Sequence, residues 1–385
     1  MNPDIEPVVL ANSKFSIDLL KVLCEASTDN VIFSPLSISS ALSLVLLGSP
    51  FESETAKQMF KYLHFGKMRI MTHYLYEELY QEGEYKVEGK RSLQLVNRMY
   101  GEKTIDFLDD FLDTCEEWCF TSLRCVDFKG NSEAVRTEIN TWLKKIGDPH
   151  QDVLDKGDVS KDTLLALISA VYFNKKWVKI FDCFYTKKCL FSGVLCDMMG
   201  KTDKLPLGTI PHRQHGTNSV QAQILEIPYE NNHLSMFIIL PASRDLEKLV
   251  KLITYENIME WTEPDNMIPT DVHIVMPIFK LEEKYDLEKA LKALGMTDLF
   301  SDKCDLSGMS RTKLKLSKML HKCVVDVNMT GTDAQGGGGA ECTNALKETP
   351  YMPFIVDKPF LFFIRHNPTK SILFWGRVAS LKPVL

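Results

Sequence analysis

The spacing of apolar residues changes along this chain, from helical periodicity in the first third to strand patterns in the rest. Ser34-Pro35 and Gly48 are typical start and stop residues, and they bracket an apolar helix. Leu164 to Phe173 and Leu234 to Leu240 are apolar runs typical of strands buried on both faces. Helices followed mostly by strands predict an α+β fold in which one large sheet carries helices on a face.

Shorter segments extend this prediction toward the C-terminus. The pattern predicts a half-exposed strand at Val272–Met276, a helix at Tyr285–Leu294, and a final hairpin of Phe360–Ile364 and Ile372–Trp375. Neither an internal repeat nor a dividing linker is visible in the sequence. Although a length of 385 residues suggests two or three domains, the pattern favours one large fold.

Composition excludes several classes of protein. Apolar residues make up 45% and charged residues 25%, as in ordinary globular proteins. The net charge of −6 is spread over interspersed signs, so we expect neither a nucleic acid nor a membrane surface as partner. Apolar runs are all shorter than the roughly 18–20 residues of a membrane-spanning helix.

The first residues predict a protein that stays in the cytoplasm. Met1 to Glu6 is acidic where a secretory signal is basic, and Pro7 to Ala11 is too short for the apolar part of such a signal. From Asn12 the pattern is that of an amphipathic helix. Release from the cell without a signal stays open.

The cysteines and histidines indicate no metal site, and we expect no cofactor. Ten cysteines show no CxxC pair and no zinc spacing, so we interpret them as reduced thiols. The redox state of Cys342 in a polar loop stays open. His212 and His215 lie in a polar loop without ligating neighbours, so we interpret them as solvated.

Near the C-terminus, a long polar segment separates two core-like strands, Val324–Val327 and Phe360–Ile364. It contains four consecutive glycines, Gly336 to Gly339, and Leu346 is its one large apolar residue. It cannot form a core of its own, and a long loop inside an ordered domain is usually functional or disordered. Its position favours function.

Short motifs are distributed over nearly the whole chain. They are Asn30–Ile38, Asn97–Gly101, Ala170–Phe173 with Trp177, Leu234–Pro241, Met276–Glu282, Leu294–Met296, Asp305–Met309, His321–Lys322 and Asp357–His366. These motifs, in this order, resemble those of the serpin family. The absent signal and the ending of the last motif resemble the ovalbumin-type intracellular branch, clade B.

This resemblance implies a suicide-substrate inhibitor of serine or cysteine proteases, which itself catalyses nothing. A single serpin domain would span residues 1–385, with about nine helices on a large mixed sheet, smaller sheets, and a hinge and exposed reactive loop at 329–353. A protease would attack the loop and form an acyl-enzyme. The cleaved loop would then insert into the large sheet as an extra strand and deform the protease. We expect a monomer without a heparin site.

The hinge of the loop would begin at Gly331. Inward positions are small and uncharged, so nothing obstructs insertion. Four glycines replace the family's alanine-rich stretch, which could cost on the order of 2–4 kcal/mol of insertion energy, and Met329 replaces an acidic residue. The hinge residues are Gly331, Thr332, Asp333, Ala334, Gln335, Gly336, Gly337, Gly338 and Gly339.

Two further groups of residues follow from the resemblance. Ser34, Ser37 and His321 match the shutter under the large sheet, and Trp177 matches the breach. Ser169 stands where the family has an asparagine, and we expect its shorter side chain to leave room for a bridging water. A core histidine with no further role is the alternative for His321.

The scissile bond is expected about fourteen residues after Gly331, at Ala345–Leu346. Because the loop is slightly long, Leu346–Lys347 and Lys347–Glu348 stay open. Ala345 suits elastase-like proteases, Leu346 chymotrypsin- or cathepsin-like ones, and Lys347 trypsin-like ones.

Two functions stay open at this point. One is an inhibitory intracellular serpin. The other is a non-inhibitory serpin-fold binding or storage protein whose loop is only a substrate, favoured by the glycines, Met329 and Ser169. An enzyme is disfavoured, because the sequence has no Gly-x-Ser-x-Gly elbow, phosphate loop or metal cluster.

Overall fold

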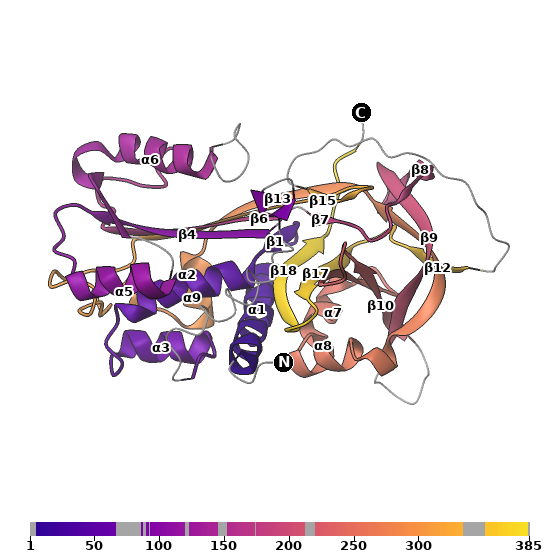
Figure 1. The fold of residues 1–385 in the computed structure, drawn as a ribbon, viewed down its shortest axis with the longest axis horizontal. Coiled ribbons are helices and arrows are strands. Elements are labelled where there is room, and N and C mark those ends of the chain that lie inside the picture. The colour runs from indigo at the N-terminus through magenta and orange to yellow at the C-terminus, as the bar shows by residue number, and fades with distance from the viewer. Residues whose placement is uncertain are drawn as a thin grey trace. The chain divides into compact units, whose positions relative to one another are not determined.

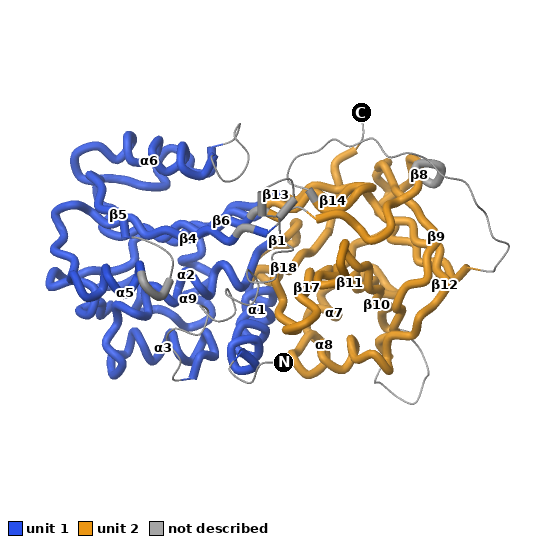
Figure 2. Tube along the Cα trace, in the orientation of Figure 1, with its two compact units in different colours: residues 1–22, 33–172, 282–323 blue, residues 23–32, 173–281, 324–385 orange. Residues whose placement is uncertain are grey.

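The structure, a computed structural model, describes residues 5–66, 86–87, 90–91, 93–119, 123–144, 152–173, 175–211, 220–333 and 351–383 (Figure 1). Contacts divide the chain into two compact units, each made of three segments (Figure 2). Unit 1 contains residues 1–22, 33–172 and 282–323, and unit 2 contains residues 23–32, 173–281 and 324–385. One serpin domain over residues 1–385 stays a prediction.

Unit 1 holds most of the helices. Strands β5, β4, β6 and β14 lie side by side in that order in a seven-stranded sheet. The elements of unit 1 are α1 (Glu6–Ala26), α2 (Pro35–Leu47), α3 (Glu54–Tyr62), β2 (Lys86–Val87), β3 (Lys90–Arg91), β4 (Leu93–Glu102), α5 (Asp109–Cys119), β5 (Leu123–Val126), α6 (Phe128–Lys144), β6 (Leu165–Phe173), α9 (Glu288–Leu294) and the first part of β14 (Lys318–Val327). The last residues of α1 and β6 extend into unit 2.

Unit 2 is built mainly of strands. The nine-stranded sheet has the order β1-β18-β17-β11-β10-β9-β12-β16, with β8 paired to β9. The elements of unit 2 are β1 (Val31–Phe33), β7 (Lys175–Lys176), β8 (Asp182–Phe191), β9 (Val194–Pro211), β10 (Val220–Pro228), β11 (Leu234–Pro241), α7 (Leu246–Leu252), α8 (Tyr255–Trp261), β12 (Ile268–Pro277), β13 (Phe279–Asp286), β15 (Gly331–Asp333), β16 (Met352–Ile355), β17 (Phe360–His366) and β18 (Ser371–Val378). Of these, β1 and β13 extend into unit 1.

The predicted helix start at Ser34 is confirmed. The Ser34 side chain accepts a hydrogen bond from the Ser37 N–H, Pro35 is the first helical residue, and Gly48 caps the C-terminus of α2. A serine cap and an early proline both suit the first turn, whose N–H groups lack partners within the helix. All residues of α2 from Pro35 to Leu46 are buried, its four serines included, so α2 is a core helix.

The strand predictions are also confirmed. All residues of β11, β17 and β18 are buried, as their continuous apolar sequences require. β12 buries Val272, Ile274 and Met276 and leaves the residues between them partly exposed. The predicted hairpin forms between β17 and β18, which pair antiparallel from Phe360↔Val378 to His366↔Ser371.

Two predicted helix boundaries are wrong. α1 begins at Glu6 rather than near Asn12, because Pro7 is tolerated in a first turn. The segment predicted as a helix from Tyr285 is strand β13 as far as Asp286, and α9 begins only at Glu288. The described residues hold eight α-helices, none of them long and apolar enough to cross a membrane.

Candidate functional site

The central feature of unit 1 is the parallel pairing of β6 with β14. Residues 166–171 pair with residues 318–323, and Ser169 lies directly opposite His321. Both side chains are fully buried. His321 therefore lies on β14, the strand that leads a few residues later into the predicted hinge.

Beneath this pair, polar side chains form a continuous hydrogen-bonded chain. His321 Nδ1 lies 2.9 Å from Ser169 Oγ, and Ser169 Oγ lies 2.8 Å from Ser37 Oγ. Ser37 Oγ donates to Asn97 Oδ1 at 3.3 Å, and the Asn97 amide donates to Ser37 O and to Ser40 Oγ. The structure thus brings together all four residues predicted for the shutter.

The backbone N–H of Ser34 fixes the direction of the hydrogen bonds that run from His321 through Ser169 to Ser37. The Ser34 N–H donates to His321 Nε2 at 3.1 Å, so Nε2 carries no proton. The neutral ring then has its proton on Nδ1 and donates it to Ser169, which in turn donates to Ser37. Burial lowers the pKa of His321 to about 3, and this keeps the ring neutral.

The expected gap at Ser169 does not exist. Its hydroxyl contacts both Ser37 and His321 directly, so no bridging water is needed, contrary to the expectation from the sequence. Asn97 supplies an amide to the same cluster from β4, a neighbour of β6. Asn97 belongs to the predicted motif Asn97–Gly101 but was not predicted to join this cluster. The polar side chain of Asn97 directly after the apolar Leu95 and Val96 was the available signal.

Helix α6 and the segment after it, together called the lid below, cover the opposite face of the same strands. α6 and the segment after it pack their apolar side chains, including Ile139 and Leu154, against Ala166 and Ile168 of β6 and Leu320 of β14. β6 and β14 are therefore enclosed on both faces, by the shutter cluster on one and by this lid on the other.

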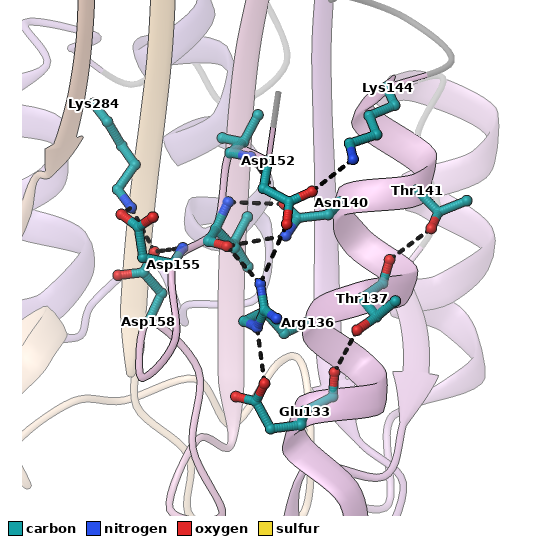
Figure 3. A network of polar contacts seen from close by, with 12 residues as sticks. Glu133, Arg136, Thr137, Asn140, Thr141, Lys144, Asp152, Asp155, Asp158 and Lys284 are labelled. Atoms are coloured by element: carbon teal, nitrogen blue, oxygen red, sulfur yellow. Dashed lines mark hydrogen bonds and ion pairs between the residues drawn. The ribbon is translucent and has the colours of Figure 1, made fainter. Parts of the chain in front are cut away.

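Polar contacts hold the lid in place (Figure 3). Asn140 of α6 donates to Leu154 O and accepts the Leu154 N–H, at 2.9 and 2.8 Å. Lys284 of β13 forms ion pairs with Asp155 and Asp158 in the segment after α6. The Lys284 ammonium lowers the pKa of Asp155. Side chains from two elements thus fasten the segment between α6 and β6.

In unit 2, the first hinge residues already belong to a sheet. β15 (Gly331–Asp333) pairs antiparallel with the end of β14 on one side and with β7 on the other. Thr332 is fully buried, as predicted for an inward position. A Cβ at Gly331 would lie 2.1 Å from Lys175 O, so only glycine fits there.

Aromatic side chains surround this hinge. Trp177 is buried and stacks on Tyr229, with ring centroids 4.5 Å apart, and its indole N–H donates to Asn328 O. The Tyr229 and Thr332 hydroxyl oxygens lie 2.7 Å apart. Burial raises the pKa of Tyr229, so its hydroxyl stays protonated. Trp177 was expected at the breach from its motif, whereas Tyr229 belongs to no motif and was not predicted.

The turn before the hinge contains Asn328-Met329-Thr330, which formally matches the Asn-x-Ser/Thr glycosylation signal. The Asn328 side-chain oxygen accepts hydrogen bonds from Thr330 N–H, the Thr330 hydroxyl and Gly331 N–H. Asparagine commonly stabilises turns through its own side chain in this way. The remaining predicted loop residues, Ala334 to Gly339 and Ala345 to Glu348, together with Cys342, lie outside the described residues, as do His212 and His215.

Comparison with known proteins identifies the family. Residues 10–381 match the family described as serpin (serine protease inhibitor), and the chain belongs to that family. Serpins are protease inhibitors rather than enzymes. Its curated relatives in clade B include the leukocyte elastase inhibitor of Bos taurus, 40% identical over 98% of this chain and 100% of that protein. Serpin B3 of Homo sapiens is 35% identical over 96% of this chain and 98% of its own.

Solved structures agree with this assignment. The structure of uncleaved ovalbumin matches with a TM-score of 0.86 and 27% identity, over 97% of this chain and all of that one. Maspin matches with a TM-score of 0.85 and 31% identity, over 98% of this chain and all of its own. The serpin fold predicted from the sequence is therefore confirmed.

We expect His321 to make the protein sensitive to acid. Its pKa falls from an ordinary 6.5 to about 3 on folding, so the unfolded chain binds the extra proton between these values. Stability from the neutral ring is complete above pH 6.5 and is lost as the pH falls toward 3. Lowering the pH from neutral to about 4.5 should reduce the free energy of unfolding by about 2–3 kcal/mol through protonation of this group.

Denaturant unfolding of the wild type and of His321→Gln across this pH range measures the effect. Glutamine can accept from Ser34 and donate to Ser169 without titrating. The difference in unfolding free energy between the two proteins should therefore change with pH. Parallel pH curves for the two proteins would show that His321 does not titrate as described.

Proposed function

We propose that this protein is a suicide-substrate inhibitor of serine proteases that traps its target by inserting the cleaved loop between β6 and β14. The observation that carries the proposal is that the hinge already belongs to a sheet: Thr332 and Asp333 pair with β14 on one side, and Gly331 and Thr332 pair with β7 on the other. Insertion then only extends a strand that has already begun. A cysteine protease is a second class of target, because it also forms an acyl-enzyme.

The register of the hinge supports one path for the rest of the loop. Thr332 pairs with Val327 and Asp333 with Asp326, so each further residue lies one step back along β14. Continued in this register, Gly336 would lie opposite Cys323 and Gly338 opposite His321. These are the positions where Val171 and Ser169 of β6 pair now.

Insertion by this route would have two costs in unit 1. β6 must separate from β14, which breaks the Ser169–His321 contact, and the lid held by Asn140 and Lys284 must shift. Glycine contributes no side chain at the position opposite His321, so the entering strand gains little packing where it replaces Ser169. The tetraglycine therefore slows the step that has to outrun release of the protease.

A non-inhibitory binding or storage protein is the alternative function. Two observations favour it: the four glycines, and the Tyr229–Thr332 contact that already stabilises the resting hinge. In that case a protease would cut the loop and leave. The two functions differ in what happens after cleavage, so one reaction distinguishes them.

Elastase-, chymotrypsin- and cathepsin-like proteases are the targets we propose. One relative is named leukocyte elastase inhibitor, and cleavage after Ala345 would suit an elastase-like pocket. Cleavage after Leu346 would suit the other two. Action as a monomer, without a heparin-type cofactor and in the cytoplasm, stays a prediction.

Incubation with pancreatic elastase, and separately with chymotrypsin, tests the proposal. A trapped acyl-enzyme should appear as a band of higher mass that survives denaturing gel electrophoresis. Loop cleavage without trapping, with a midpoint of thermal unfolding unchanged by the cut, would exclude the inhibitory mechanism. A sharply raised midpoint without a complex would show that insertion occurs but is too slow to trap.

Thr332→Arg should convert the inhibitor into a substrate. The side chain of Thr332 is fully buried against Tyr229, and an arginine there would leave an unpaired charge in the sheet. The number of serpin molecules consumed per protease inactivated should rise about tenfold or more. Thr332→Val is the matched control, since it keeps the size and removes only the hydroxyl. Equal trapping by the arginine variant would contradict insertion through this position.

Replacing Gly336–Gly339 with alanines should improve trapping. Alanine restricts the free loop and adds packing after insertion, so the acyl-enzyme should partition toward the trapped state. The measured quantity is again the stoichiometry of inhibition, which should fall toward one while the association rate stays unchanged. Separate Gly336/Gly338 and Gly337/Gly339 pairs would show which face limits insertion. An unchanged stoichiometry would mean that the glycines do not limit it.

A further inference from the structure

We infer that Cys189 and Cys196 form a reversible modification site, in which oxidation joins the two strands of the β8–β9 hairpin through a disulfide. The two residues are direct partners in the antiparallel pairing of these strands. The inference is independent of protease inhibition, because it rests on a part of unit 2 that the proposed mechanism does not use.

Register places the two side chains on one face. Residues directly opposite each other in an antiparallel pair point to the same side of the sheet. Their Cα atoms lie about 4.5–5.5 Å apart in such pairs, and disulfides span Cα separations of about 4.4–6.8 Å. Formation of the bond therefore requires rotation of side chains rather than movement of the backbone.

The hairpin holds this register firmly. Ser192 and Gly193 form its two-residue turn with φ values of 48° and 89°, as a tight turn between twisted strands requires. Phe191 beside the turn is fully buried and packs against Phe360, and the Ser192 N–H donates to Asp357 O. A slip of one residue would expose Phe191, so the two cysteines stay opposite each other.

The two thiols differ in ways that suit successive steps. Cys189 is exposed on β8, which among the described strands pairs only with β9, whereas Cys196 is 2% exposed. Burial and the Asp197 carboxylate raise the pKa of the Cys196 thiol. An oxidant in solution therefore meets Cys189 first, and Cys196 reacts second.

The chemistry balances with a peroxide as the oxidant. Cys189 thiolate attacks one peroxide oxygen and forms a sulfenic acid, which releases water. The Cys196 sulfur then attacks the Cys189 sulfur, a second water leaves, and both thiol protons end in the two waters. Excess small-molecule thiol reverses the reaction by exchange, because the bond is exposed on the Cys189 side.

Trypsin digestion offers a direct readout. Cleavage after Lys188 and Lys201 releases residues 189–201 as one peptide, which contains these two cysteines and no others. After treatment of the folded protein with hydrogen peroxide and alkylation of the remaining thiols, this peptide should carry no alkyl group and should lack two hydrogen atoms. Treatment with dithiothreitol before alkylation should restore the doubly alkylated peptide.

Controls separate this pair from general thiol oxidation. Cys125 is also exposed, and its partner across the pairing is Gly101, so it should stay alkylatable under mild peroxide or form only its own acids. In Cys196→Ser, Cys189 should progress to the sulfinic acid instead of a disulfide. A wild-type peptide with oxidised Cys189 and a free, alkylated Cys196 would overturn the inference, and so would equal disulfide yields in folded and urea-unfolded protein.

Discussion

The pairing of β6 with β14 is the interaction on which the rest of the site depends. It places Ser169 opposite His321. β6 also occupies the edge of β14 along which the described hinge strand would have to extend. Inhibition by insertion therefore means exchange of one strand partner for another. In the proposed mechanism, the balance between the two pairings would decide whether the protein traps a protease or is merely cut.

The shutter cluster gives this pairing a specific chemical character. A single backbone N–H, that of Ser34, sets the tautomer of His321, and the tautomer sets the direction of the hydrogen bonds through Ser169 and Ser37. Because the cluster is buried, breaking it leaves polar groups unpaired until new partners arrive. In the proposed insertion, a glycine opposite His321 would bring backbone groups but no side chain, so the exchange would gain little there.

Local patterns in the sequence predicted much of the architecture. Ser34, Pro35 and Gly48 marked α2 because capping depends on a few adjacent residues. Continuous apolar runs marked β6 and β11 because both faces of these strands are covered. The start of α9 was predicted too early, since residues of β13 before it carry a spacing compatible with either element.

The sequence by itself determined the family and the serpin fold, because both follow from local motifs. The hinge role of Gly331 and the shutter role of Ser34, Ser37, Ser169 and His321 stay predictions from the same motifs. Only the tertiary structure decided that Asn97 joins the shutter, that Tyr229 meets Thr332, and that Cys189 faces Cys196. These contacts depend on strand register and on which elements become neighbours. Distances between residues far apart in the chain are set by packing of the whole fold, and no single segment encodes them.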